Sequence, residues 1–199
     1  MYILVKHDPW HDYYARRARK ERYPARSVYK LEEIQKRFGV LKRRGRALDL
    51  GCYPGSWLIY ASRIVGDRGH VIGVDITPLT LRIPSNVRFI QHDVMAWDES
   101  FLEAVGKNIG TVLSDMAPST TGSKFVDAQR SLQLSESALA ISARVLRPGG
   151  NFVCKIFHGS DFKGFSDRVR RSFGRVVHFK PISSRKASKE IYIVGLGRT

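Results

Sequence analysis

The stretch that most constrains this chain is residues 46–57, RALDLGCYPGSW, an apolar segment followed by a glycine-containing turn. The apolar residues predict a short buried strand, and Gly51 and Gly55 allow a tight bend close to a ligand. Pro54 suits the first turn of a following helix, which carries Trp57. A strand, a glycine loop and a helix in this order predict a cradle for a cofactor.

The spacing of the glycines narrows the class of ligand. A dinucleotide-binding loop needs G-x-G-x-x-G, so that pyrophosphate can approach the backbone at the helix N-terminus. This loop has G-x-x-x-G with a bulky Tyr53, which favours a nucleoside ligand without pyrophosphate, such as S-adenosylmethionine. Asp75, twenty residues beyond Gly55, follows a second apolar strand at 70–74 and can accept from both ribose hydroxyls. The competing interpretation is an ordinary strand–helix turn of an α/β protein.

Length and composition favour one soluble domain. The 199 residues, 43% of them hydrophobic and 26% charged, suit a single globular domain over 1–199. No apolar run approaches the roughly 18 residues of a membrane span, and the start, MYILVKHDPW, lacks the apolar core of a signal peptide. We therefore expect a cytoplasmic monomer without a membrane or protein partner. Cys52 and Cys154 lack C-x-x-C spacing and predict buried thiols, and no metal-ligand cluster is visible.

The net charge of +16 is unevenly distributed. Residues 1–46 hold fourteen Lys and Arg against five Asp and Glu, and residues 155–199 hold eleven against three. Residues 47–154 hold nine against ten. A near-neutral centre between basic ends predicts a small-molecule core with a surface for a polyanion, most simply nucleic acid. The alternative, a charged surface kept for solubility, usually mixes both signs.

Residues 9–22 combine a helix start with a dense basic face, within a basic N-terminal helical arm at about 1–45. Tyrosines alternate with the basic residues, and arginine and tyrosine can both stack on bases, which favours an arm that contacts RNA. The alternative is a solvated helix whose tyrosines pack inward. The expected RNA contacts include basic residues elsewhere and are Arg16, Arg17, Arg19, Lys20, Arg22, Arg26, Arg185 and Lys186.

A second helix is predicted to begin at Ala25 or Ser27 and to end at Phe38, because its apolar residues recur at the spacing of one buried stripe. Lys30 lies off that stripe. Spacing alone therefore predicts that Lys30 is a surface lysine.

From residue 46 onward, strands and helices alternate, which predicts an α/β fold with a parallel sheet and helices on both faces. A final pair of strands predicts a terminal hairpin. The expected strands are 46–50, 70–74, 87–91, 110–114, 150–156, 175–180 and 190–196, and the expected helices are 54–65, 99–107, 124–146 and 161–173.

Ligands of an open parallel sheet bind beyond the carboxyl ends of its strands, and those ends carry charged residues here. Asp93 and Asp115 follow the third and fourth strands, and Lys155 lies in an apolar fifth strand, where a lysine is costly unless paired. Glu190 begins the last strand, which reaches the same edge if it runs antiparallel. Asp115, Lys155 and Glu190 are therefore expected to converge. Each also has an ordinary interpretation, as a turn acid, a solvent-reaching lysine or a surface charge partner.

The chain resembles the FtsJ/RrmJ family of ribose 2'-O-methyltransferases over nearly its whole length. The matching stretches, in the same order as in the family, are ARSVYKLEEI, LDLGCYPGSW, GVDITPL, QHDV, LSDMAP, VLRPGG, FVCKIFHG and SSRKASKEIYIVGLG. The resemblance implies a Rossmann-like class I S-adenosylmethionine-dependent methyltransferase fold, with a mostly parallel seven-stranded sheet and an antiparallel last strand. It also implies large-subunit rRNA as the substrate, methylated on a ribose hydroxyl, most simply of a uridine.

The same resemblance places the family's site residues on this sequence. Its catalytic Lys-Asp-Lys-Glu set falls on Lys30, Asp115, Lys155 and Glu190, so Lys30 becomes a site residue. Cofactor contacts are implied at Gly51, Gly55, Trp57, Asp75, Asp93 and Asp115. The loop departs from the family's usual two alanines at Cys52 and Tyr53, where the tyrosine either narrows the pocket or swings outward.

The implied reaction is an in-line displacement in which the 2'-hydroxyl attacks the sulfonium methyl. Lys155 is a candidate general base, since desolvation and nearby positive charge favour its neutral form, whereas Asp115 opposes this. The alternative is a charged Lys155 that orients the nucleophile and stabilises negative charge on its oxygen. Competing functions are 2'-O-methylation of tRNA, RNA binding with a vestigial cofactor pocket and, least favoured, NAD-dependent oxidation.

Overall fold

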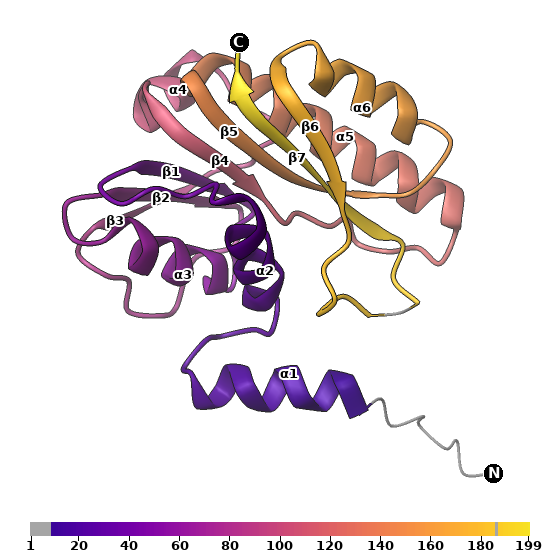
Figure 1. Ribbon diagram of the computed structural model, residues 1–199, viewed down its shortest axis with the longest axis horizontal. Helices are drawn as coiled ribbons and strands as arrows, with labels where there is room; N and C mark the ends of the chain where they lie inside the picture. Colours follow the sequence, from indigo (N-terminus) through magenta and orange to yellow (C-terminus); the bar gives the residue numbers. More distant parts are fainter. Residues whose placement is uncertain (1–8, 186) are drawn as a thin grey trace.

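The computed structural model describes residues 9–185 and 187–199, which form one seven-stranded sheet flanked by helices (Figure 1). The order of strands in the sheet is β3-β2-β1-β4-β5-β7-β6. The strands are β1 Arg46–Leu50, β2 His70–Asp75, β3 Val87–Gln91, β4 Ile109–Ser114, β5 Leu146–Phe157, β6 Phe173–Phe179 and β7 Glu190–Arg198. The helices are α1 Pro9–Lys20, α2 Val28–Phe38, α3 Ser56–Val65, α4 Glu99–Val105, α5 Lys124–Val145 and α6 Phe162–Arg170.

The direction of the strands confirms the expected fold class. β1 to β5 pair in parallel, whereas β7 runs antiparallel to both β5 and β6. The expected terminal hairpin is therefore β6 and β7. Strand order reverses between β1 and β4, and this switch point opens a crevice beyond the carboxyl ends of these strands.

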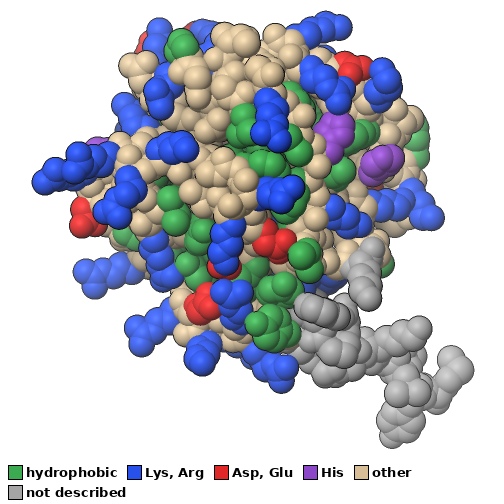
Figure 2. All heavy atoms as spheres, viewed as in Figure 1, with side chains coloured by type: hydrophobic (Ala, Val, Ile, Leu, Met, Phe, Trp, Pro, Cys, Tyr) green, Lys and Arg blue, Asp and Glu red, His purple; other side chains and the backbone are tan. Residues whose placement is uncertain are grey.

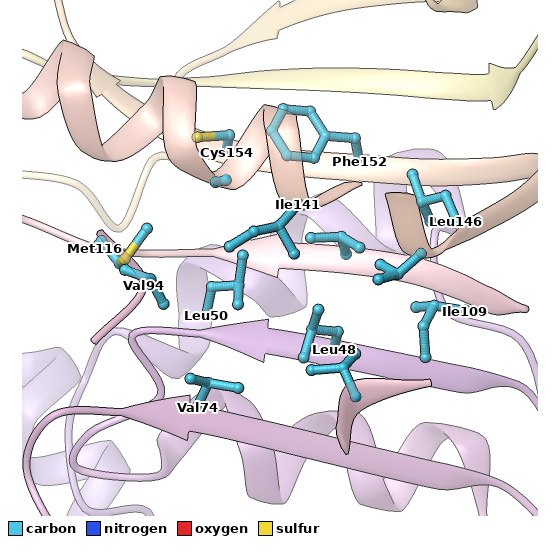
Figure 3. Packing of buried hydrophobic residues seen from close by; sticks show 14 of the residues in the cluster. Leu48, Leu50, Val74, Val94, Ile109, Met116, Ile141, Leu146, Phe152 and Cys154 are labelled. Carbon is cyan, nitrogen blue, oxygen red and sulfur yellow. The ribbon is translucent and has the colours of Figure 1, made fainter. Parts of the chain in front are cut away.

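Two hydrophobic clusters hold the sheet between its helices. Leu48, Leu50 and Phe152 belong to the cluster under α4, α5 and α6, part of which is drawn in Figure 3. Ala47 and Val153 belong to the opposite cluster under α2 and α3. Neighbouring residues of one strand thus enter different cores, as the two-residue period of a strand requires. Each fully buried large apolar side chain stabilises the fold by about 1.5–3 kcal/mol.

Several element boundaries differ by a few residues from those expected, and two of the differences have a clear structural cause. α3 begins at Ser56, because Gly55 adopts a left-handed φ of 105° as its N-cap, so Pro54 lies in the loop and not in the helix. β5 begins at Leu146, which pairs with Ile109 before the register shifts. The turn expected to precede the strand is therefore an irregularity within it.

The first two helices pack on each other through a small third cluster. Ala18 and Tyr23 contact Val28 and Tyr29 there. α1 lies apart from the sheet, with α2 between them (Figure 1). Along 9–185 and 187–199, every helix is too short or too polar to cross a bilayer. Cys52 and Cys154 are buried free thiols, as expected.

Candidate active site

Three charged residues lie on the face of the sheet that α2 and α3 cover. Asp115 follows β4, Lys155 lies in β5 and Glu190 begins β7. Each is two residues from a side chain buried in the cluster of α2 and α3, namely Leu113, Val153 and Tyr192. Because side chains alternate along a strand, all three charged residues face α2. The fourth, Lys30, comes from α2 itself.

These four side chains form two ion pairs. Lys155 Nζ lies 3.0 Å from Asp115 Oδ1, with the two side chains 6% and 16% exposed. The same Nζ donates to the carbonyl oxygen of Asp115. Lys30 Nζ lies 2.6 Å from Glu190 Oε1, with side chains 12% and 10% exposed. The prediction from spacing that Lys30 is a surface lysine is wrong. Helical periodicity describes only the helix itself and cannot show that Glu190 of β7 pairs with Lys30.

The two pairs also act on each other electrostatically. Burial alone would raise the pKa of Asp115, but the charges of Lys155 and Lys30, together with hydrogen bonds from Tyr192 and Lys155, hold this pKa below its ordinary value. The Asp115 carboxylate therefore stays ionised at neutral pH, paired with Lys155.

Tyr192 supports Asp115, and sequence reasoning did not identify it. Its side chain is fully buried, and its hydroxyl donates to Asp115 Oδ1. Tyr192 pairs with Lys155 across the β5–β7 ladder and stacks on Trp57 at 5.9 Å. The available signal was its position two residues after Glu190, on the same face of the strand.

A cavity of about 360 Å³ opens beside Asp115 at the switch point. Asp75 lines it, accepting from the amides of Tyr53 at 2.9 Å and Thr77 at 2.8 Å. Asp93 lines it as well and uses one carboxylate oxygen to accept from the amide of Met95. A carboxylate has about four acceptor sites, so both aspartates keep capacity for a ligand.

Gly51 and Gly55 both have a positive φ, and a Cβ on either would clash with a neighbouring side chain. A Cβ on Gly51, which lines the cavity with a φ of 74°, would lie 2.3 Å from Met116 Cγ. A Cβ on Gly55 would meet Leu81 Cδ2 at 2.5 Å.

Gly55 and Trp57 are not among the residues that line the cavity, and the indole of Trp57 donates to the Ser27 carbonyl instead. Tyr53 lines the cavity while staying 51% exposed, so it lies at the mouth.

Two further polar side chains near the cavity were not identified from the sequence. Asp49 is buried in β1, and neither carboxylate oxygen has a partner among the described residues. Burial raises the pKa of Asp49 well above its ordinary value, and Asp115 and Asp75 raise it further. His92 lines the cavity and stacks on Phe101 at 4.6 Å, and its Nε2 is buried without a partner in 9–185 and 187–199. The only sequence signal for Asp49 was an acid within an apolar strand.

The residues expected to bind RNA are placed in different environments. Arg17 is bound within the protein, by ion pairs to Glu21 at 2.7 Å and Glu32 at 3.4 Å and by its position over the Tyr29 ring. Arg26 is half-buried. The others that the structure describes are exposed, namely Arg16, Arg19, Lys20, Arg22 and Arg185, whereas Lys186 lies outside the described residues. Figure 2 shows many Lys and Arg but few Asp and Glu side chains on the face in view.

The loop that carries Arg185 is held by α2. Glu33 accepts from the amides of Ile182 at 2.7 Å and Ser183 at 2.9 Å. Lys30, one turn earlier on α2, binds Glu190 at the other end of the loop. One helix therefore fixes both ends of the segment between β6 and β7.

Comparisons with known proteins identify the family to which the chain belongs. A family model described as FtsJ-like methyltransferase matches residues 23–198, which include both ion pairs and the cavity. The chain belongs to the FtsJ-like methyltransferase family.

Individual relatives of this FtsJ-like methyltransferase cover nearly all of it. A protein of Desulforapulum autotrophicum named Ribosomal RNA large subunit methyltransferase E is 50% identical over 97% of this chain and 95% of its own length. A protein of the same name from Desulfatibacillum aliphaticivorans is 53% identical over 94% of this chain and 90% of its own. A solved Plasmodium falciparum chain, provisionally named a ribosomal RNA methyltransferase, superposes with a TM-score of 0.79 at 28% identity, covering 88% of this chain and 98% of that one.

Proposed function

We propose that this methyltransferase transfers a methyl group from S-adenosylmethionine to a ribose 2'-hydroxyl, most simply of a uridine, in large-subunit rRNA. The observation that carries the proposal is the pair of ion pairs, Lys155 with Asp115 and Lys30 with Glu190, beside the cavity. The names of the relatives support rRNA as the substrate. The substrate would be met within the large subunit in the cytoplasm, by a monomeric enzyme with a single domain over 1–199.

The residues of the cavity fit S-adenosylmethionine. Asp75 has acceptor capacity for the ribose hydroxyls and Asp93 for the adenine amino group, and Gly51 lines the cavity without a side chain. Bound there, the cofactor supplies an activated methyl group on a sulfonium. Asp115, which lines the same cavity, joins the cofactor region to Lys155.

The protein's own contribution is alignment and charge placement. Lys155 donates to both the carbonyl and the carboxylate of Asp115, which leaves its third hydrogen for the attacking 2'-oxygen. We propose that this ammonium orients the hydroxyl and stabilises negative charge on its oxygen. As the C–O bond forms, the bond between the methyl group and sulfur would break to leave S-adenosylhomocysteine, and the hydroxyl proton would pass to water. Lys30 and Glu190 would hold the ribose. The other assignment makes Lys155 a general base. Lys155 would then first have to lose its own proton, which the neighbouring Asp115 carboxylate opposes.

The test is transfer of labelled methyl groups to isolated large subunits, naked rRNA and tRNA. We expect label in the large-subunit rRNA. Label found only in tRNA would overturn the substrate, and calorimetry that detects no binding of S-adenosylmethionine would favour an RNA-binding protein with a vestigial pocket.

A further inference from the structure

A second cavity lies at the opposite edge of the sheet from the active site. It has a volume of about 360 Å³ and is lined by the loop before β1, by Asn108 before β4, and by the irregular start of β5. These segments are the amino ends of parallel strands, whereas Asp115 and Lys155 lie toward the carboxyl ends. Along β1 the two edges are separated by about 13 Å, from four residue steps of ~3.3 Å. We call this second cavity the edge cavity.

The edge cavity is lined by cations without acids. Its charged lining residues are Lys42, Arg43, Arg44, Arg46 and Arg147, and none of the Asp and Glu residues that the structure describes lines it. All five are exposed, and none forms an ion pair with another side chain in the described part of the chain. Exposed cations of a soluble protein usually alternate with acids, so five together indicate a surface shaped for an anion.

The backbone that carries these cations is held on both sides. The amide of Arg44 donates to the Val65 carbonyl of α3 at 2.7 Å, and the Gly45 carbonyl accepts from His70 of β2 at 3.0 Å. Arg44 has a left-handed φ of 58°, which turns the chain sharply at this point. The four cations at 42–46 therefore project from a fixed turn, whereas Arg147 projects from the start of β5.

The wall of the edge cavity is also fixed. The carbonyl of Val40 accepts from Thr111 Oγ1 at 2.7 Å and from Asn151 Nδ2 at 3.0 Å. Both donors line the edge cavity. The hydrogen bonds of Thr111 and Asn151 thus join the loop to β4 and β5, and a bound anion would not have to order this part of the site.

We propose that the edge cavity binds the phosphodiester backbone of a second rRNA segment, separate from the segment that presents the methylated nucleotide. Guanidinium groups bind phosphate in a bidentate manner, and three of the five cations are arginines in or beside a fixed turn. A folded rRNA is large enough to reach both edges of the sheet, which a small anion is not. This inference rests on the proposed function, because it takes rRNA as the substrate.

The test removes three charges from the edge cavity and, as a matched control, three from α6 and the residue after it. The edge variant is Arg43→Gln, Arg44→Gln and Arg147→Gln, and the control is Lys163→Gln, Arg170→Gln and Arg171→Gln. Arg46 is left in place because it also lines a neighbouring cavity that contains Glu103. Binding of naked large-subunit rRNA is measured as a function of salt.

We expect the edge variant to bind at least about tenfold more weakly at ~0.1 M salt, with a salt slope smaller by roughly two to three, since each lost phosphate contact removes about 0.7–0.9. The control should bind within about twofold of the unmodified protein, and a variant with lysine at the same three edge positions should retain most of the affinity. Equal affinity in the edge variant and the unmodified protein, or equal losses in edge variant and control, would overturn the proposal.

Two further measurements separate this inference from the proposed function. Calorimetry with S-adenosylmethionine should give equal affinities for the edge variant and the control, which shows that both are folded. If the unmodified protein binds rRNA but transfers no methyl group to it, the proposed function fails, while the comparison of edge variant and control still decides the edge cavity.

Discussion

The two edges of the sheet use their charges in opposite ways. At the carboxyl ends of the strands, two lysines and two acids are nearly buried and paired at 2.6 and 3.0 Å. At the amino ends, five cations are exposed and form no ion pair within the described residues. Buried ion pairs are held in one geometry, as a reaction requires. Unpaired surface cations can instead neutralise the phosphates of a nucleic acid and release its counterions. In the account proposed above, one edge performs the chemistry and the other holds the RNA.

The largest expected effect comes from breaking a pair at the active edge. Lys155→Ala should lower methyl transfer by at least about 10²–10³-fold, the loss typical of one transition-state donor. Its affinity for S-adenosylmethionine should change little, since Lys155 does not line the cofactor cavity. Single-turnover transfer and calorimetry measure the two effects.

Lys163→Ala is the control for that experiment, because it removes an exposed lysine of α6 that is paired only with Asp167 among the described residues. Near-normal transfer by Lys155→Ala would contradict the assignment. A loss of cofactor binding in Lys155→Ala would instead show a wider structural defect.

Substitutions in the N-terminal arm test whether RNA is bound only by those cations that form no ion pair within the described residues. Arg16→Glu, Arg19→Glu and Lys20→Glu together should weaken rRNA binding by about 10–100-fold at moderate salt and spare cofactor binding. The measurement is rRNA affinity against salt. Arg17→Gln is the contrast, because its guanidinium already contacts Glu21 and Glu32, and it should change stability more than RNA affinity. Unchanged RNA affinity in the triple variant would exclude the arm as an RNA contact.

Tyr192→Phe sharpens the account of the active edge. It removes one hydrogen bond to an ionised aspartate, a contribution of about 1.5–3 kcal/mol, so kcat should fall roughly tenfold to a hundredfold while the KM for RNA changes little. Without that bond, the pKa of Asp115 should rise, and activity should decline at a higher pH during acidification. A normal kcat with a normal pH profile would show that Tyr192 only fills space.

Asp49 is the exception at the active edge, a buried acid without a partner among the described residues. Its raised folded pKa means that the folded protein holds this proton more tightly than the unfolded chain, whose aspartates titrate near about 3.9. The contribution of this proton to the free energy of unfolding is fully present at pH values below the unfolded pKa. It is lost as the pH rises toward the folded pKa.

Asp49→Asn keeps a neutral side chain at every pH. Its stability relative to the unmodified protein should therefore grow with pH, by up to ~1.4 kcal/mol per pH unit within that window. Urea denaturation at about pH 5 and about pH 7 measures the difference, and a constant difference would show that the folded pKa of Asp49 is not raised.

The sequence predicted the sheet well because strand periodicity and turn residues are local signals. Asp115, Lys155 and Glu190 could be assigned to one edge because strand direction determines where each strand ends. Lys30 could not be assigned in this way, since its partner lies 160 positions later in the chain. Only the resemblance to a family indicated its role.

Partners that depend on tertiary packing were not predictable in the same way. The sequence pattern predicted Arg17 as an RNA contact but did not predict its ion pairs with Glu21 and Glu32. In the sequence, Tyr192 is one strand residue among several, and its hydrogen bond to Asp115 was not predicted. The edge cavity joins the loop before β1 to the irregular start of β5, about a hundred residues apart. The composition shows that the chain has an excess of positive charge, but it does not show at which edge of the sheet this charge gathers.

The most direct test of the central claim is the position of the transferred methyl group. Large subunits are incubated with the protein and labelled S-adenosylmethionine, and the purified rRNA is hydrolysed with alkali. A ribose whose 2'-hydroxyl is methylated cannot cleave its own phosphodiester, so the account predicts that the label is retained in one alkali-resistant dinucleotide. Label released in mononucleotides would show methylation of a base and would contradict it.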